Sequence, residues 1–235
     1  MPVDYFGEEV AARYDDDAEV FDPLVVDPVV DLLAGLAGDG AALELGIGTG
    51  RIALPLAARG VPVHGIDLSE AMIARLKAKP GADRIGVTVG DFATTRVEGA
   101  FSLVYLVFNT IGNLTTQDEQ VACFENAAAH LARGGRFVIE LGVGRGGPLE
   151  VFHFGETHVG VDEYDAATQR LVSHHFSLVD GGWQRRSIPF RRVGTGELDL
   201  MARLAGLRLR ERWGGWKREP YTAESAMHVS VWEKP

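Results

Sequence analysis

The chain has 235 residues, a net charge of −10 and a single cysteine, Cys123. This length suits one α/β domain with a small insertion, and it is enough to bury a core without disulfides or a structural metal. The acidic charge argues against general binding to nucleic acid or to an anionic membrane. The lone cysteine excludes an intramolecular disulfide. No signal peptide or apolar run of ~18 residues is visible, so we expect a cytoplasmic protein.

Residues 1–40 are expected to form helices ahead of the core. The segment GEEVAARYDDD predicts a short helix that ends near Tyr14. Asp27 followed by Pro28 has the pattern of a helix start, with Asp as the N-cap and Pro in the first turn. The apolar residues after this pair recur at helical spacing and predict one buried face, made of Val29, Val30, Leu33 and Leu36.

Residues 41–142 alternate between strand-like and helix-like segments. The predicted strands are ALELG, VPVHGID, IGVTVGD, FSLVYLVFN and RFVIELG. Helices are expected in RIALPLAARG, after a Ser69 cap with Met72, Ile73 and Leu76 facing inward, and after Thr116, whose spacing to Glu119 predicts a capping box. Strands that alternate with helices predict crossover connections and a mainly parallel sheet.

The alternation stops in residues 143–193. Four short segments rich in β-branched and aromatic residues follow one another there, separated by turn residues, and they predict a small antiparallel insertion packed over the main sheet. The earlier pattern returns in residues 194–235. Thr195 is expected to cap a helix, and LRLRERW and AMHVSVWEK are expected to form a terminal antiparallel hairpin. The inward face of that helix is predicted to contain Leu198, Met201, Leu204 and Ala205.

Three glycines follow the first predicted strand in the sequence LELGIGTG, at positions 46, 48 and 50. Glycines at this point allow a tight turn into a helix and let a ligand touch the backbone. The dinucleotide fingerprint G-x-G-x-x-G/A is not met, because Arg51 occupies its third position. Glu44, just before the glycines, would also repel a pyrophosphate. A positively charged ligand fits this turn better than a dinucleotide.

The pattern E-x-G-x-G-x-G resembles the first motif of the class I S-adenosylmethionine-dependent methyltransferases. HGIDLS after the second strand resembles that family's second motif, and GDF after the third strand resembles its third motif. The resemblance implies a Rossmann-like class I methyltransferase fold, with a mostly parallel seven-stranded sheet, helices on both faces and the small antiparallel insertion. It also implies S-adenosyl-L-methionine as the cofactor.

The family resemblance further assigns roles to single residues. Asp67 would bind the ribose, Leu68 would pack on the adenine, Asp91 would meet the adenine amino group and Phe92 would cover the ring. Residues 1–40 would act as a helical lid that closes Tyr14 over the methionine end, and residues 143–193 as a roof over the substrate. The full set of implied cofactor contacts is Tyr14, Glu44, Gly46, Gly48, Arg51, Asp67, Leu68, Met72, Asp91, Phe92 and Phe108.

Ordinary structural roles remain open for several of these residues. Asp67 can cap the following helix, Glu44 can bond a backbone amide, and Asp91 can be a turn residue. Phe92 and Met72 can belong to the core, and Tyr14 can be a surface aromatic on a helix.

We expect the enzyme to transfer a methyl group to nitrogen or oxygen of a small molecule by in-line displacement. A neutral amine needs only positioning, whereas a hydroxyl needs a general base. The candidates for such a base are Glu140, His153 and His175, with His158 and His174 nearby in the insertion. No diagnostic metal-ligand spacing is present, so no metal is expected.

Two other functions stay open from the sequence. An NAD(P)-dependent oxidoreductase would need a Tyr-x-x-x-Lys pair, but Tyr105 and Tyr164 are followed at that spacing by Asn109 and Thr168. A non-catalytic cofactor-binding protein of the same fold is the second alternative. The expected partner is a small-molecule methyl acceptor, a homodimer is left open, and the Ala- and Arg-rich composition is typical of a bacterial protein.

Overall fold

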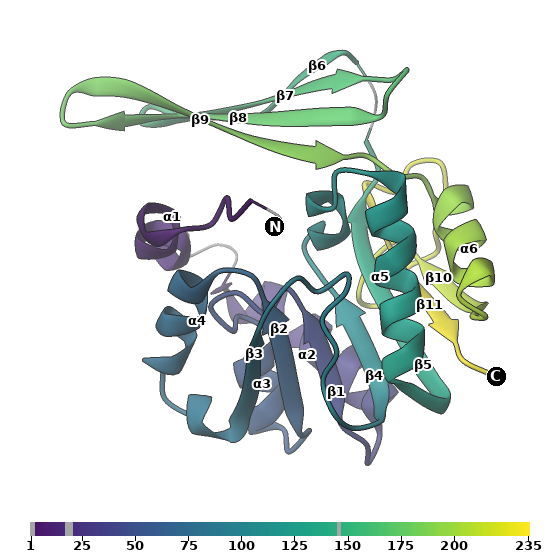
Figure 1. Ribbon diagram of the computed structural model, residues 1–235. Coiled ribbons are helices and arrows are strands. Elements are labelled where there is room, and N and C mark those ends of the chain that lie inside the picture. Colours follow the sequence, from purple (N-terminus) through teal and green to yellow (C-terminus); the bar gives the residue numbers. More distant parts are fainter. Residues whose placement is uncertain (1–2, 17–20, 145–146) are drawn as a thin grey trace.

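The computed structural model describes residues 3–16, 21–144 and 147–235, and Figure 1 shows the arrangement of its elements. The helical segments are α1 (Glu8–Arg13), η1 (Tyr14–Asp16), α2 (Pro23–Ala37), α3 (Ala53–Ala58), α4 (Glu70–Lys77), η3 (Ala82–Arg84), η4 (Thr110–Asn113), α5 (Gln117–His130) and α6 (Thr195–Leu204). The strands are β1 (Ala42–Leu45), β2 (Val63–Asp67), β3 (Ile85–Val89), β4 (Phe101–Leu106), β5 (Leu131–Gly142), β6 (Leu149–Phe154), β7 (His158–Asp165), β8 (Arg170–Val179), β9 (Gly182–Arg191), β10 (Arg208–Trp213) and β11 (Met227–Glu233).

A seven-stranded sheet forms the centre of the molecule, in the order β10-β11-β5-β4-β1-β2-β3. The five strands from β1 to β5 pair in parallel, and β11 pairs antiparallel with both β5 and β10. Helices α5 and α6 cover one face of this sheet, and α2 and α3 cover the other (Figure 1), with a separate cluster of buried apolar side chains in each layer. The predicted Rossmann-like fold is confirmed.

Burial on both faces explains the apolar character of the central strands. All residues of β1 are buried, and a strand covered on both sides normally contains apolar residues throughout. Glu44 is the exception in this strand, and it is only 3% exposed. A carboxyl group at such a position needs a partner or a function.

Helix α2 begins earlier than the sequence predicted. Asp22 is its N-cap and accepts a hydrogen bond from the Leu24 N–H at 2.8 Å, and Pro23 occupies the first turn. The predicted start at Asp27 and Pro28 is therefore wrong, because Pro28 lies inside the helix. Two Asp-Pro pairs occur five residues apart in the printed sequence, and the first one is used because the helix can then also bury Val26.

The predicted antiparallel insertion is confirmed as a four-stranded sheet in the order β6-β7-β8-β9. Figure 1 shows this sheet beyond the edge at which the parallel strands of the main sheet end. Strand β9 approaches η4, the turn that follows β4. The second sheet therefore lies on the side of the molecule to which the carboxyl ends of the parallel strands point.

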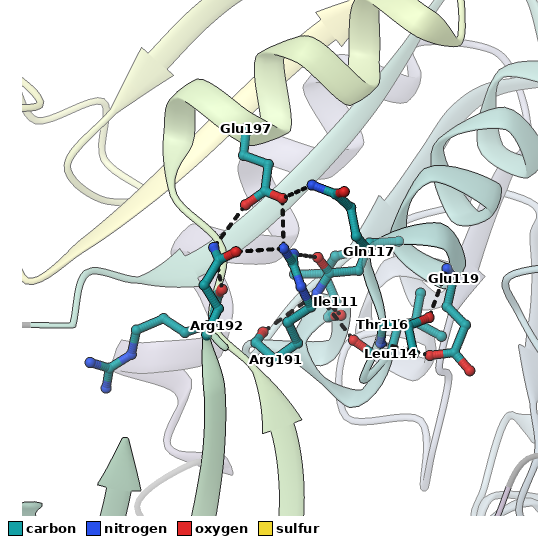
Figure 2. A network of polar contacts seen from close by, with 10 residues as sticks. Ile111, Leu114, Thr116, Gln117, Glu119, Arg191, Arg192 and Glu197 are labelled. Carbon is teal, nitrogen blue, oxygen red and sulfur yellow. Dashed lines mark hydrogen bonds and ion pairs between the residues drawn. The ribbon is translucent and has the colours of Figure 1, made fainter. Parts of the chain in front are cut away.

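A buried polar network joins this second sheet to α5 and α6, as Figure 2 shows. The Arg191 guanidinium lies 2.7 Å from Glu197 of α6, donates to Gln120 of α5 at 2.6 Å, and donates to Gln169 at 2.8 Å. Arg191 is only 7% exposed, so these contacts replace its hydration. Gln117 adds a further hydrogen bond to Glu197. The network fixes one end of the insertion to the main body.

Helix α6 differs in two details from the prediction. Its N-cap is Gly194, and Thr195 is already the first helical residue without a side-chain cap bond. Leu204 is 71% exposed, while Leu198, Met201 and Ala202 are buried. At about 100° per residue, position 204 lies roughly 120° away from position 198, so the prediction that Leu204 faces inward is wrong. None of the helices among the described residues has the length and apolarity that a membrane crossing requires.

Candidate functional site

The glycine turn links the end of β1 to α3. Gly46 and Gly48 have φ angles of +78° and +53°, in the left-handed region that glycine adopts without strain. The Gly46 N–H donates to the Ile66 carbonyl of β2 at 2.8 Å, which draws the turn across the end of the sheet. A Cβ at Gly46 would lie 2.6 Å from the Thr110 side chain. The turn therefore needs glycine for its conformation and for its close packing.

A pocket opens where β1, β2 and β3 end. Of the predicted cofactor contacts, the ones that line it are Tyr14, Gly46, Gly48, Asp67, Leu68, Met72, Asp91 and Phe92. The other three predicted contacts, Glu44, Arg51 and Phe108, are not part of its lining. The strand order explains the grouping, because carboxyl ends of neighbouring parallel strands lie along one edge of a sheet.

Asp67 is held rigidly at the end of β2. Its Oδ2 accepts from the Gly48 N–H at 2.6 Å and its Oδ1 accepts from the Ser69 N–H at 2.9 Å. Burial raises the pKa of Asp67 above its usual value, although these two hydrogen bonds act in the opposite direction. Ser69, not Asp67, caps α4, because its hydroxyl accepts from the Met72 N–H at 3.3 Å. The Asp67 carboxylate thus faces a pocket with its orientation already fixed.

Glu44 lies beneath the turn and bonds to Tyr105, a residue with no exposed surface. The Tyr105 hydroxyl donates to Glu44 Oε2 at 2.9 Å. Burial raises the pKa of Glu44 to about 8, against the smaller opposing effects of this hydrogen bond and of the Arg51 charge. A nearby positive ligand would favour the ionised form of this carboxyl group.

Asp91 and Phe92 combine local and pocket roles. Asp91 Oδ1 accepts from the Ala93 N–H at 2.8 Å, which is the turn function that the sequence left open. Phe92 is buried and belongs to a core cluster, yet it also borders the pocket beside Asp91. Both residues therefore have a structural role and a place at the candidate site.

The N-terminal segment closes one side of the pocket. The ring of Tyr14 meets that of Phe6 edge to face, with centroids 6.3 Å apart. Asp15 accepts from the Thr49 hydroxyl at 2.6 Å and lies 2.6 Å from the Lys79 ammonium. Asp15 therefore fastens the segment to the glycine turn, a role that the sequence analysis did not identify.

Further residues border the pocket that the sequence analysis did not assign to it. They are Val3, Asp4, Tyr5, Phe6, Thr110, Asn113 and Leu114. The segment after β4 carried a usable signal, because residues that directly follow a parallel strand lie at the ligand-binding edge. The residues at the start of the chain carried no such signal.

The turn after β4 has an unusual backbone. Phe108 and Asn109 both have left-handed φ angles, of +58° and +61°. This conformation costs about 1–2 kcal/mol for a residue with a Cβ, although Asn tolerates it better than Phe. Phe108 is 48% exposed, and the Arg51 guanidinium lies 4.5 Å from the centroid of its ring. Glu140 Oε2 accepts from the Phe108 N–H at 2.8 Å.

The histidines of the insertion divide between the two faces of its sheet. His174 bonds to Ser187 at 2.8 Å and to Glu163 at 3.3 Å on one face. His175 points to the opposite face, as its neighbouring position in a strand requires. That face includes Ile188, which is only 3% exposed, so it is the face turned toward the body of the molecule.

Three imidazoles touch one another on this inner face. His158 Nε2 and His175 Nδ1 are 3.1 Å apart, and the ring centroids of His153 and His158 are 4.8 Å apart. Burial, followed by the Arg186 charge, lowers the pKa of His175 to about 4, so this ring is neutral at pH 7. Among the described residues, no group of His, Cys, Asp and Glu side chains is arranged to hold a metal ion.

Comparison with known proteins gives one family match and several relatives. Residues 42–135 match the family model described as a methyltransferase domain. Over 206 residues the chain is 29% identical to the cypemycin N-terminal methyltransferase of a Streptomyces species, with 82% of each chain covered. The structure of the CcbJ methyltransferase from Streptomyces caelestis is 34% identical, with 98% of each chain covered and a TM-score of 0.88.

A more distant structure shares the fold. CalS10 from Micromonospora echinaspora, an amino pentose methyltransferase with bound S-adenosylmethionine, is 22% identical, with 95% of each chain covered and a TM-score of 0.68. This similarity extends over both sheets and not only over the segment that carries the glycine turn.

Proposed function

Because the chain belongs to the class I S-adenosylmethionine-dependent methyltransferases, we propose that it transfers a methyl group from S-adenosyl-L-methionine to a nitrogen atom of a small-molecule acceptor. The observation that carries this proposal is the fixed Asp67 carboxylate, which faces the pocket directly beside the glycine turn. The cofactor would supply an electrophilic methyl group on a positively charged sulfur atom. The reaction would be an in-line displacement by the acceptor.

The acidic groups suit a ligand of this charge. Burial raises the pKa values of Glu44 and Asp67, so both lack enough nearby positive charge in the protein alone. A sulfonium and an ammonium group would supply it. A pyrophosphate would do the opposite, which weighs against the oxidoreductase alternative.

Several of the predicted cofactor contacts can be given a role in holding the cofactor. Asp67 would accept hydrogen bonds from the ribose hydroxyls, Leu68 and Phe92 would pack on the adenine, and Asp91 would accept from its amino group. Arg51 would pair with the carboxylate of the methionine end, because a guanidinium forms two parallel hydrogen bonds with a carboxylate. Glu44 and Tyr14 would lie near the ammonium group.

Nitrogen is favoured over oxygen as the acceptor atom. Two of the similar proteins are named for N-terminal and amino pentose substrates. An uncharged amine has a free electron pair and needs no strong base, so the enzyme would need only to orient it and exclude water. The neutral His175 and the carboxylate of Glu140 would then be dispensable as bases.

We also propose functions for the two segments outside the core. Within the predicted lid of residues 1–40, the described residues 3–16 would hold Tyr14 over the methionine end of the cofactor, whereas α2 packs on the main sheet as part of the core. Residues 143–193 would form the roof of the acceptor site, with the inner face of β6 to β9 toward the substrate. His153, His158 and His175 lie on that inner face and would contact the acceptor there.

Calorimetric titration tests the cofactor assignment. We expect micromolar binding of S-adenosylmethionine and S-adenosylhomocysteine and no binding of NADH. Asp67→Ala removes the acceptor for the two proposed hydrogen bonds from the ribose hydroxyls. It should weaken the binding of both ligands by roughly 10–100-fold, corresponding to roughly 1.5–3 kcal/mol. The matched control is Asp83→Ala, an exposed carboxylate in η3. NADH binding without S-adenosylmethionine binding would contradict the proposal.

A panel of paired acceptors tests the reaction itself. Each pair should share one carbon skeleton and differ only in an amine or a hydroxyl group, with methylated product detected by mass spectrometry. We expect product from amines alone. Product from hydroxyl compounds alone would rule out the nitrogen assignment, and cofactor binding without any product would favour the non-catalytic alternative.

A further inference from the structure

The backbone after β4 is strained at a residue that carries an aromatic side chain. Phe108 is an aromatic residue in the left-handed region, and Asn109 beside it has the same backbone conformation. Such strain persists only where surrounding contacts hold it, and it is frequent at functional sites.

Two side chains hold the turn through hydrogen bonds between the chain after β4 and the end of β5. The paired backbone register of these strands ends at Leu106 and Ile139. Directly beyond it, Glu140 Oε2 accepts from the Phe108 N–H at 2.8 Å, and Asn109 Oδ1 accepts from the Gly142 N–H at 2.6 Å. In both cases a side-chain oxygen therefore accepts a backbone N–H in place of the backbone carbonyl that would accept it in a continued parallel ladder.

The ring of Phe108 has a defined contact. The Arg51 guanidinium lies 4.5 Å from its centroid, a distance typical of a cation–π interaction. Arg51 directly follows the glycine turn, so this contact connects the ends of the adjacent strands β1 and β4. The Arg51 charge also lowers the pKa of Tyr14 against the raising effect of burial, which places the guanidinium near a residue that lines the pocket.

We propose that Glu140 is a positioning residue that keeps Phe108 in its left-handed conformation, so that the Phe108 ring holds the Arg51 guanidinium in place for the carboxylate of the cofactor. Glu140 is hydrogen-bonded to the Phe108 N–H, and the Phe108 ring contacts the Arg51 guanidinium. This inference rests on the proposed function through the role of Arg51. It requires no proton transfer by Glu140, only an oxygen atom that accepts the Phe108 N–H.

The test compares two ligands that differ in one part. S-adenosylhomocysteine carries the amino acid end, and methylthioadenosine lacks it. Glu140→Leu removes the acceptor but keeps the volume, and it should weaken S-adenosylhomocysteine about tenfold while leaving methylthioadenosine unchanged. Glu140→Gln retains an acceptor oxygen and should restore affinity to within about twofold of the wild type. Glu98→Leu, before the opposite end of β4, is the matched control.

A double-mutant cycle shows whether Glu140 acts through the ring. Phe108→Ala alone should weaken S-adenosylhomocysteine to a similar extent, and adding Glu140→Leu should cause no further loss. Additive losses, or equal losses for both ligands, would overturn the inference. Failure of the wild type to bind either ligand would instead count against the proposed function, so the two failures are distinguishable.

Discussion

At the scale of single residues, the site is dominated by two carboxyl groups whose pKa values are raised by burial. Glu44 is only 3% exposed and accepts a hydrogen bond from Tyr105, and its pKa rises to about 8. Asp67 shows the same direction of shift from the same cause. Such groups make the free protein less stable than an apolar core would, and they make a cationic ligand more favourable.

The shift at Glu44 predicts the pH dependence of stability. The folded protein binds this proton more tightly than the unfolded chain, so stability falls as pH rises from about 4.5 to about 8 and then levels off. The slope from this group is at most roughly 1.4 kcal/mol per pH unit. Glu44→Gln should remove that slope, as measured by urea unfolding between these pH values.

The control for this prediction is Glu98→Gln, because Glu98 is exposed. Glu98→Gln should unfold like the wild type at each pH. A Glu44→Gln variant with the same pH dependence as the wild type would show that Glu44 keeps an ordinary pKa in the folded protein.

At the scale of elements, the short N-terminal helix is held by few contacts. Helix α1 packs on α4, and the adjoining η1 is tied down through Asp15. The side chains of Asp15 and Lys79 are 34% and 26% exposed, so the pair is partly hydrated. An element attached in this way can open without unfolding the core.

Asp15→Asn should therefore speed the release of the cofactor more than it lowers stability. The ion pair with Lys79 is lost, while an amide oxygen can still accept from Thr49. A partly exposed pair contributes about 0–1 kcal/mol, so the melting temperature should change little. We expect severalfold faster dissociation of S-adenosylhomocysteine in stopped-flow measurements. The neighbouring Asp16→Asn is the control. Equal dissociation rates for both variants would argue that Asp15 does not hold the N-terminal segment closed.

At the scale of the whole molecule, the Arg191 network joins the two sheets. Arg191 contacts α5 and α6 from the end of β9, as seen in Figure 2, and it is nearly fully buried. A buried guanidinium is tolerated only when its donors are matched, and here Gln120, Gln169 and Glu197 match them. The orientation of the insertion over the main sheet depends on this junction.

Arg191→Met should lower the free energy of unfolding by roughly 1–3 kcal/mol. The loss is moderate because Glu197 keeps donors from Gln117 and Gln169. Urea unfolding measures it, with the exposed Arg170→Met of β8 as the control. We also expect hydrogen exchange to rise in β8 and β9 before it rises in the main sheet. Uniform exchange in both sheets would show that the junction does not hold the insertion separately.

The sequence by itself determined the order of elements and the fold. Apolar strands alternating with amphipathic helices fixed the layers, and local signals such as the Thr116 capping box held in the structure. The glycine turn and the residues at the strand ends could be placed at one edge, because parallel strands end on the same side. Where two local signals competed, as with the two Asp-Pro pairs, the sequence pattern led to the wrong one, and the packing of the helix decided for Asp22.

Tertiary structure alone decided the contacts between distant parts of the chain. Glu44 pairs with Tyr105, Asp15 with Lys79, and Phe108 with Glu140, and each pair joins residues that lie far apart in the sequence. Local periodicity reports which face of an element is apolar, but it holds no information about which side chain lies opposite. Those pairings arise only when the elements pack, because packing and register set the distances between side chains.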